Sequence, residues 1–180
     1  MMKNLGCPFL LFSDPRLEGG SFYLGSQELE NKIKETIQYY LDYLGLTSKD
    51  LILSGLSMGT FPSLYYGAAF EPRAVIVGKP LANIGTIARR GRLEAPGVFN
   101  TSFDVLRHQT DGVSSQHMED LDQIFWNNFK KADFSNTTFG FSYMKDEDMD
   151  SKAYDQLVEH LCYTGAKICL LYTSPSPRDR

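Results

Sequence analysis

The sequence has few cysteines, no long apolar run and no excess of basic residues, and each shortage excludes a class of protein. Its three cysteines, Cys7, Cys162 and Cys169, form no Cys-x-x-Cys pair, so we expect neither a disulfide framework nor a metal site. No apolar run approaches the length of a transmembrane segment, and residues 1–5 do not resemble a signal peptide. A formal charge of −4 gives no reason to expect nucleic-acid binding. These absences predict a cytoplasmic protein.

The order of apolar patterns indicates an α/β fold. At 180 residues the chain is about one domain long. Short apolar runs at 8–13, 51–54 and 74–77 alternate with helical patterns at 26–44 and 60–69. Strands that alternate with helices predict a mostly parallel sheet with helices on both faces. We expect this domain to be incomplete at both ends.

The most informative motif is Gly-x-Ser-x-Gly, formed by Gly55, Ser57 and Gly59. It follows an apolar run and precedes a helical pattern, which is the layout of a nucleophile elbow. We expect both glycines to be required because the backbones at such a turn approach too closely for a Cβ atom. The helix then directs its N-terminal N–H groups at the charge that develops in acyl transfer. The motif therefore predicts a serine acyl-transfer enzyme with Ser57 as the nucleophile.

A serine nucleophile of this kind needs a carboxylate and then a histidine later in the chain. Residues 138–143 predict a further strand, and Asp146, Glu147 and Asp148 follow it. Each of the three qualifies as the acid by position. The alternative is a solvated acidic turn that precedes the last helix.

The histidine should follow the acid by one helix and one strand, and no histidine stands there. His108 and His117 precede the acid, and His160 lies within the predicted last helix. We therefore expect the catalytic histidine to be missing from this chain, with His160 as the weak alternative.

The oxyanion hole of such an enzyme combines two backbone N–H groups. One is expected from Met58, the residue after the nucleophile. The second is expected from the loop after residues 8–13, where Arg16 or a glycine of the pair Gly19 and Gly20 is the candidate donor.

Two further regions have an expected role of their own within a partial domain that spans residues 1–168. Residues 81–115 lack clear periodicity and read as a lid-like insertion. Its basic cluster, Arg89, Arg90 and Arg92, either binds an anionic group or forms a solvated face. Residues 169–180 resemble the translation of a sequencing adapter, and we expect them to be a non-native tail; the alternative is a natural Ser/Pro-rich end.

Several stretches resemble the accessory secretory protein two family of the bacterial accessory Sec system. The resemblance covers LILSGLSMGTFPSLYYGAA (51–69), AVIVGKPLANIGTIARRGR (74–92), RLEAPGVFNTSFD (92–104) and FWNNFKKADFSNTTFGFSYMKDEDMDSKAY (125–154). The run Val-Gly-Lys-Pro-Leu-Ala-Asn-Ile-Gly is far more specific than the serine motif. Pro62 departs from the small residue expected at that point of the helix.

The resemblance implies a truncated α/β-hydrolase-like domain of a longer protein. Ser57 matches the family nucleophile, Glu147 best matches its acid, and the family histidine has no counterpart here. The family is implicated in O-acetylating N-acetylglucosamine on serine-rich repeat adhesins, for which acetyl-CoA is the implied acyl donor. It also helps to export these glycoproteins with sister accessory proteins and a dedicated SecA/SecY translocase, which implies a cytoplasmic protein held peripherally at the membrane.

Two other functions remain open at this point. The domain could be a non-catalytic binding or chaperone component of the secretion complex, with the lid-like insertion as its contact surface. It could also be a generic serine carboxylesterase, which would hydrolyse small acyl esters.

Overall fold

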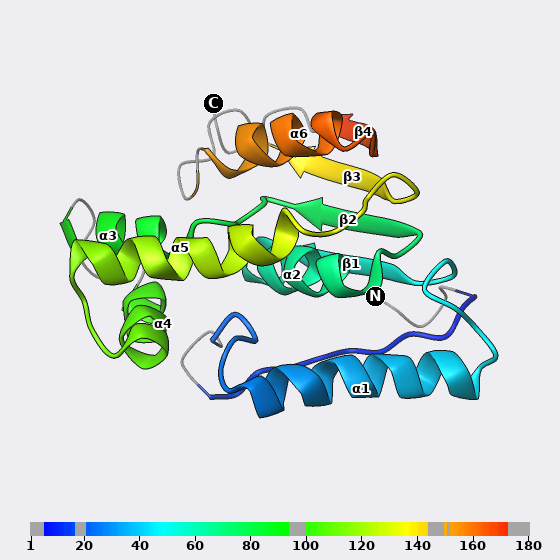
Figure 1. Cartoon of the computed structure of the whole chain (residues 1–180), viewed down its shortest axis with the longest axis horizontal. Helices are drawn as coiled ribbons and strands as arrows, with labels where there is room; N and C mark the ends of the chain where they lie inside the picture. The colour runs from blue at the N-terminus through cyan, green and yellow to red at the C-terminus, as the bar shows by residue number, and fades with distance from the viewer. Residues whose placement is uncertain (1–5, 17–20, 94–99, 144–149, 151, 173–180) are drawn as a thin grey trace.

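A computed structural model describes residues 6–16, 21–93, 100–143, 150 and 152–172 (Figure 1). Its centre is a four-stranded sheet in the order β1-β2-β3-β4, in which every neighbouring pair is parallel. The strands are β1 (Ile52–Leu56), β2 (Ala74–Gly78), β3 (Thr138–Tyr143) and β4 (Lys167–Tyr172). The predicted parallel α/β architecture is therefore confirmed.

The helices connect these strands and begin at residues with suitable caps. They are α1 (Gln27–Tyr43), α2 (Thr60–Phe70), α3 (Ile84–Leu93), α4 (Asn100–Thr110), α5 (Ser115–Phe129) and α6 (Ala153–Tyr163). Ser26 caps α1 by accepting a hydrogen bond from the Leu29 N–H at 3.2 Å, as the sequence predicts. The apolar stripe of α1 is buried at Ile33, Ile37 and Leu41.

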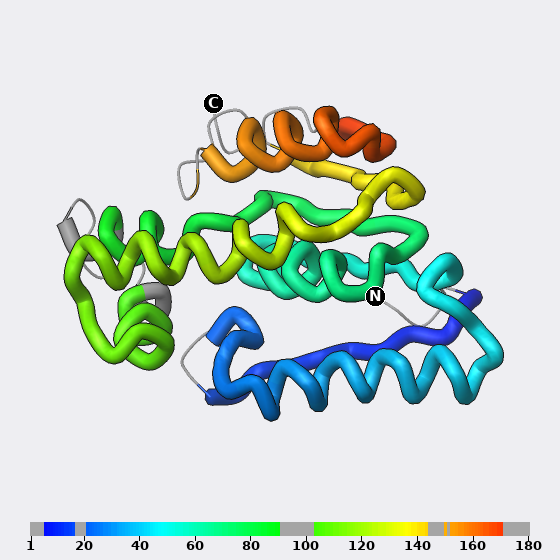
Figure 2. The backbone as a smooth tube through the Cα atoms, in the orientation of Figure 1, coloured from blue at the N-terminus to red at the C-terminus, as the bar shows by residue number. Residues whose placement is uncertain are grey.

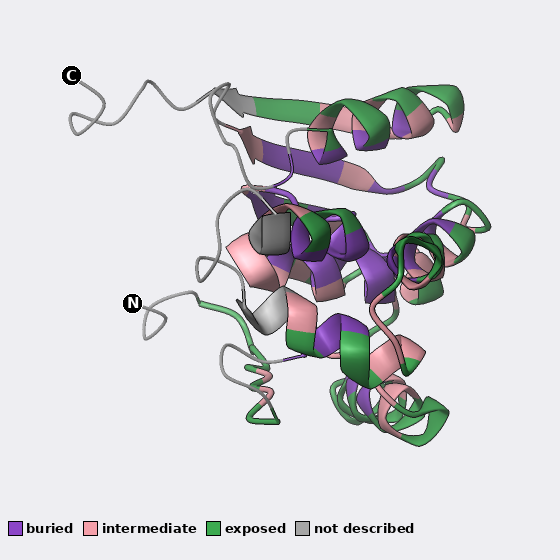
Figure 3. Cartoon of the chain, turned by 90° about the vertical axis from the view of Figure 1, so that its left-hand side faces the viewer, coloured by how far each residue is buried: buried purple, intermediate pink, exposed green. Residues whose placement is uncertain are grey.

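The core lies between the sheet and the helices that pack on one of its faces (Figure 3). Alternate residues of the central strands point into it, and Val75, Val77, Phe139 and Phe141 are all buried. A chain of phenylalanine rings joins α2 to β3 through α5, with ring centres 5.2 to 6.2 Å apart. Each buried ring contributes about 1.5–3 kcal/mol, so this contact fixes α2, and with it the turn that precedes α2.

The opposite face of the sheet is open in the described part of the chain. Ile52, Leu56, Ile76 and Leu170 are 52%, 69%, 42% and 60% exposed. The second helical layer that we expect does not lie among the described residues.

Residues 8–13 differ from their prediction as a buried strand. They form no strand, and Phe9 and Leu11 are 53% and 78% exposed. The prediction is wrong because a buried strand needs a partner on each ladder, and this segment pairs with no described strand.

Residues 81–115 are more regular than the sequence indicates, because α3 and α4 lie within them. Figure 1 shows α3 and α4 beyond the carboxyl ends of the strands, and Figure 2 traces the same path of the backbone. Their role as a lid stays a prediction. At the other end of the chain, β4 runs through Cys169 to Tyr172, and residues 173–180 lie outside the described residues, so the proposed boundary after residue 168 also stays a prediction. None of the described helices has the length and apolar character needed to cross a membrane.

Candidate active site

Ser57 stands where a strand becomes a helix. It follows β1 directly, begins a short 3-10 turn (Ser57–Gly59) and is followed by α2. Its backbone is left-handed, with φ 53°, and its side chain is half-buried. A residue with a Cβ atom is strained in that region, and such strain gathers at functional sites. The turn therefore has the form that a nucleophile elbow requires.

The two glycines of the motif play different roles. A Cβ atom on Gly55 would lie 1.9 Å from the carbonyl oxygen of Gly59, so the backbone approach at Gly55 excludes any side chain. A Cβ atom on Gly59 would meet nothing within 4 Å. The steric requirement that we expect at both glycines thus holds at Gly55 and is wrong at Gly59, because the close approach is made by the Gly59 backbone itself.

Side-chain hydroxyls hold the start of α2. Thr60 Oγ1 donates to the Ser57 carbonyl at 2.6 Å, and Ser63 Oγ donates to the Gly59 carbonyl at 2.9 Å. Pro62 falls in the first turn of α2, where its missing N–H costs no helical hydrogen bond. Its departure from the family pattern therefore leaves the helix intact.

The candidate oxyanion donors are Met58 and Arg16. Met58 follows Ser57 within the 3-10 turn and is half-buried; its role as a donor stays a prediction. The Arg16 N–H donates to Asp14 Oδ1 at 3.2 Å, and the Arg16 guanidinium binds the same carboxylate. The hydrogen bonds from the Arg16 guanidinium hold the pKa of Asp14 well below its usual range. The Arg16 N–H thus already has an acceptor, and the glycines at 19 and 20 lie outside the described residues.

The candidate acids, Asp146, Glu147 and Asp148, also lie outside the described residues. The sheet nevertheless shows where their segment begins. Leu56 pairs with Gly78 and Gly78 pairs with Ser142, so β1 and β3 end at the same level with β2 between them. Two strand spacings amount to about 10 Å. The segment after β3 therefore starts at the same edge of the sheet as Ser57, and the acid stays a prediction.

All three histidines lie in helices. His117 belongs to the capping box of α5 with Ser114, and His108 lies in the last turn of α4. His160 of α6 is half-buried with its ring centre 5.7 Å from that of Phe129, and burial lowers its pKa. His160 Nε2 is buried and has no hydrogen-bond partner among the described residues. The suggestion that His160 is the base stays untested.

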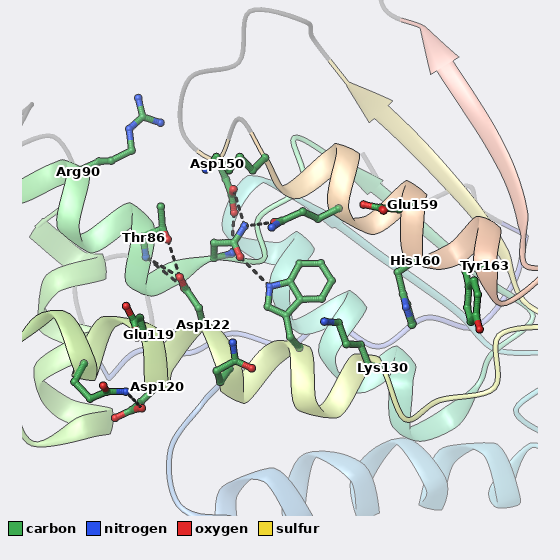
Figure 4. A pocket seen from close by; sticks show the side chains of 16 residues that line it. Thr86, Arg90, Glu119, Asp120, Asp122, Lys130, Asp150, Glu159, His160 and Tyr163 are labelled. Carbon is green, nitrogen blue, oxygen red and sulfur yellow. Dashed lines mark hydrogen bonds between the residues drawn. The ribbon is translucent and has the colours of Figure 1, made fainter.

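A groove of about 990 Å³ runs between α5 and α6 (Figure 4). It is lined by polar side chains, including Asp150 and Asn83, which the sequence analysis missed as a pair. Arg90 lines it too, whereas Arg89 is exposed and the side chain of Arg92 is not described. The role of this basic cluster stays a prediction.

Asp150 and Asn83 form a buried polar network. Asp150 accepts hydrogen bonds from the N–H groups of Ala82, Asn83 and Ala153 at 2.8 to 3.1 Å, and from Asn83 Nδ2 at 3.0 Å. Asn83 Oδ1 accepts from Trp126 Nε1 at 2.8 Å. The network joins the loop after β2 to α5 and to the start of α6. In the sequence, Asn83 stands out only as part of the family-specific run at residues 77–85. Nothing in that run indicates that Asp150 is its hydrogen-bonding partner.

Asp122 of α5 caps the beginning of α3. It accepts hydrogen bonds from the Gly85 N–H and the Thr86 hydroxyl, both at 2.7 Å (Figure 4). Burial nevertheless dominates and raises the pKa of Asp122 to about 6. A carboxyl group whose pKa is raised in the folded state stabilises that state most below its unfolded pKa.

We therefore expect the stability advantage of the wild type over Asp122→Asn to shrink as the pH rises. Between pH 4 and 6 the folded state keeps a proton on Asp122 that the unfolded state has lost. The difference in free energy of unfolding between the wild type and Asp122→Asn should be smaller at pH 7 than at pH 4 by on the order of 1 kcal/mol. The effect is no larger because Asp122 is only half-buried and solvent screens its charge. Urea unfolding of both proteins at a series of pH values measures this. A difference that stays constant from pH 4 to pH 7 would contradict the prediction.

Comparison with protein families extends the likeness over nearly the whole chain. The family model described as "Accessory Sec system GspB-transporter" matches residues 1–171. An accessory Sec system protein from Streptococcus gordonii is 54% identical over 168 residues, and one from Staphylococcus aureus is 48% identical over 168 residues. Each alignment covers 93% of this chain but only 33% and 32% of the respective relative. The chain thus spans about a third of the length of these relatives.

Solved structures show the same fold. The glycosylation-associated protein (Gap123) complex from Streptococcus agalactiae matches with a TM-score of 0.84 and 45% identity, over 89% of this chain and 31% of that one. A variant capsule O-acetyltransferase of Neisseria meningitidis serogroup A, in complex with CoA, matches with a TM-score of 0.63 and 19% identity, over 88% of this chain and 62% of that one. The second likeness concerns the fold alone.

Proposed function

The chain belongs to the accessory Sec system GspB-transporter family, and we propose that it is the serine acyltransferase domain of a longer secretion component. In this proposal Ser57 accepts an acetyl group and passes it to a hydroxyl of N-acetylglucosamine on a serine-rich repeat adhesin. The observation that carries the proposal is the left-handed, half-buried Ser57 between β1 and α2. The strained serine lies at the strand-to-helix turn of the Gly-x-Ser-x-Gly motif, which is the position of the nucleophile in a nucleophile elbow.

The chemistry follows from the position of Ser57. A base removes the proton from Ser57 Oγ while the oxygen attacks the acyl carbonyl carbon, and the Met58 N–H and the N-terminus of α2 stabilise the oxyanion. The donor's leaving group departs with that proton, which leaves acyl-Ser57. The acceptor hydroxyl then loses its proton to the base, and its oxygen attacks the ester carbonyl carbon. The bond from that carbon to Ser57 Oγ breaks, and the base returns the proton to Ser57 Oγ. The base is a histidine oriented by Glu147, and the longer protein must supply that histidine.

Two likenesses support the donor and the partners in this proposal. The fold shared with a CoA-bound O-acetyltransferase is compatible with acetyl-CoA as the donor. The likeness to a chain of the Gap123 complex supports assembly with sister accessory secretory proteins. If the domain associates with an accessory SecA/SecY translocase during export, it lies in the cytoplasm, peripherally at the membrane.

Ser57→Ala in the full-length protein tests this function. We expect the exported adhesin to lose its O-acetyl groups, measured by mass spectrometry of its glycans, while the exported amount stays near the wild-type level. Ser54→Ala is the matched control because Ser54 is an exposed residue of β1, three positions before the nucleophile. Normal acetylation by the Ser57→Ala variant would refute the enzyme, and lost export with normal acetylation would favour the non-catalytic binding role.

A further inference from the structure

Two neighbouring strands leave the sheet through left-handed residues at the same level. Ser57 follows Leu56, Lys79 follows Gly78, and Leu56 pairs with Gly78. Ser57 has φ 53° and Lys79 has φ 58°. A left-handed residue with a side chain is strained, and it persists only where its surroundings hold it. Something must therefore hold both turns.

The Thr60 hydroxyl lies between these two turns. Thr60 is 0% exposed, and its Oγ1 donates to the Ser57 carbonyl at 2.6 Å. The same oxygen accepts from the Leu81 N–H at 2.9 Å and lies 3.5 Å from the Lys79 carbonyl. One buried hydroxyl thus joins the turn after β1 to the turn after β2.

The turn after β2 is itself fixed on its other side. The Lys79 N–H donates to the Ser142 carbonyl of β3 at 3.0 Å, and the Ala82 N–H donates to Asp150 at 3.0 Å. Asp150 is buried, with 8% of its surface exposed. Through Thr60, the backbone of Ser57 is therefore connected to the turn after β2, and that turn is hydrogen-bonded to β3 and to Asp150.

We propose that Thr60 is a positioning residue for the nucleophile, and this inference rests on the proposed acyltransferase function. Its hydroxyl holds the Ser57 carbonyl, and thereby the left-handed backbone that presents Ser57 Oγ to the acyl donor. Thr60 acts through Ser57 and does not touch the substrate. Without the hydroxyl, the Leu81 N–H loses its acceptor, and the Ser57 carbonyl keeps only the backbone N–H of Thr60 as a donor. We expect this loss to relax the turn at Ser57 and to leave the donor site unchanged.

Three substitutions in the full-length protein test this role. Thr60→Val keeps the shape and removes the hydroxyl, Thr60→Ser keeps the hydroxyl, and Thr60→Cys puts a weak hydrogen-bonding group in its place. The matched control is Thr137→Val, since Thr137 is also 0% exposed but its hydroxyl has no partner in the part of the chain that the structure describes. Thr137 precedes β3, at the opposite end of the sheet from Ser57.

The readouts are the acylation rate of Ser57 by p-nitrophenyl acetate, the KM for acetyl-CoA and the melting temperature. We expect Thr60→Val to lower the acylation rate about 10- to 100-fold, because a buried hydrogen bond left unmade is worth about 1–3 kcal/mol. KM should stay within about twofold, since the donor site is untouched. Thr60→Ser should restore most of the rate, Thr60→Cys should fall between, and Thr137→Val should match the wild type.

Several outcomes would overturn the role of Thr60. A folded Thr60→Val variant with the wild-type rate would do so, and so would equal losses in Thr60→Val and Thr137→Val. If Thr60→Val does not fold, a Thr60→Cys rate equal to that of Thr60→Ser decides against the inference. Ser57→Ala, run in parallel, separates the two proposals: acylation that survives in Ser57→Ala removes the proposed function itself.

Discussion

Replacing Gly55 with alanine is expected to destabilise the fold by more than about 3 kcal/mol and to abolish reactivity at Ser57. The new Cβ atom would lie 1.9 Å from the Gly59 carbonyl oxygen and 2.3 Å from its carbon. Both are backbone atoms, so no rotation of a side chain can relieve the clash. The turn between β1 and α2 must open, and the left-handed geometry of Ser57 must be lost with it. Urea unfolding of the purified chain at 25 °C measures the loss of stability.

Gly59→Ala is the matched control for this change. It adds the same methyl group four residues away, where a Cβ atom would meet nothing within 4 Å and the backbone is helical, with φ −68°. We expect its free energy of unfolding to be unchanged or raised by roughly 0.4–1 kcal/mol, since alanine restricts the unfolded chain. Equal losses in the two variants would show that the motif tolerates no side chain at either position and would reject the steric account.

Asp150→Ala is expected to cost about 3–5 kcal/mol in the free energy of unfolding. The substitution removes the acceptor of the N–H groups of Ala82, Asn83 and Ala153 and of the Asn83 side-chain amide. Trp126 is the single tryptophan of the chain and donates to Asn83, so its fluorescence should change as the network loosens.

Asp42→Ala provides the comparison for Asp150→Ala. Asp42 is an exposed carboxylate of α1 that accepts one hydrogen bond, from Gln38 at 2.7 Å. Its loss should change the free energy of unfolding by less than about 0.5 kcal/mol and leave the Trp126 fluorescence unchanged. If Asp150→Ala unfolds within about 1 kcal/mol of the wild type, the network around Asn83 does not hold these elements together.

Local patterns predicted the framework that carries the candidate site. The apolar runs at 51–54 and 74–77 became β1 and β2, and the stripe after Ser26 became the buried face of α1. These signals are reliable because they depend on neighbours three or four positions away, or on burial of a whole run. The start of α5 carries a weaker local signal, because its capping box of Ser114 and His117 uses a histidine in place of the usual Glu or Gln.

The segment at 8–13 shows where such reasoning fails. Its composition suits a buried strand, yet Leu11 is 78% exposed in the described structure. An apolar run indicates that a segment prefers burial, but a strand also needs a neighbouring strand for its backbone hydrogen bonds. That partner is chosen by the whole fold.

By itself, the sequence determined the parallel α/β framework and the place of Ser57 between a strand and a helix. Both depend on patterns of neighbouring residues within short segments of the chain. Only the tertiary structure decided which glycine is sterically required, that Thr60 joins two strained turns, and that Asp150 binds Asn83. The Thr60 and Asp150 contacts join residues 21 and 67 positions apart. A hydrogen bond over such a distance depends on where two elements meet in space, and no local spacing encodes that.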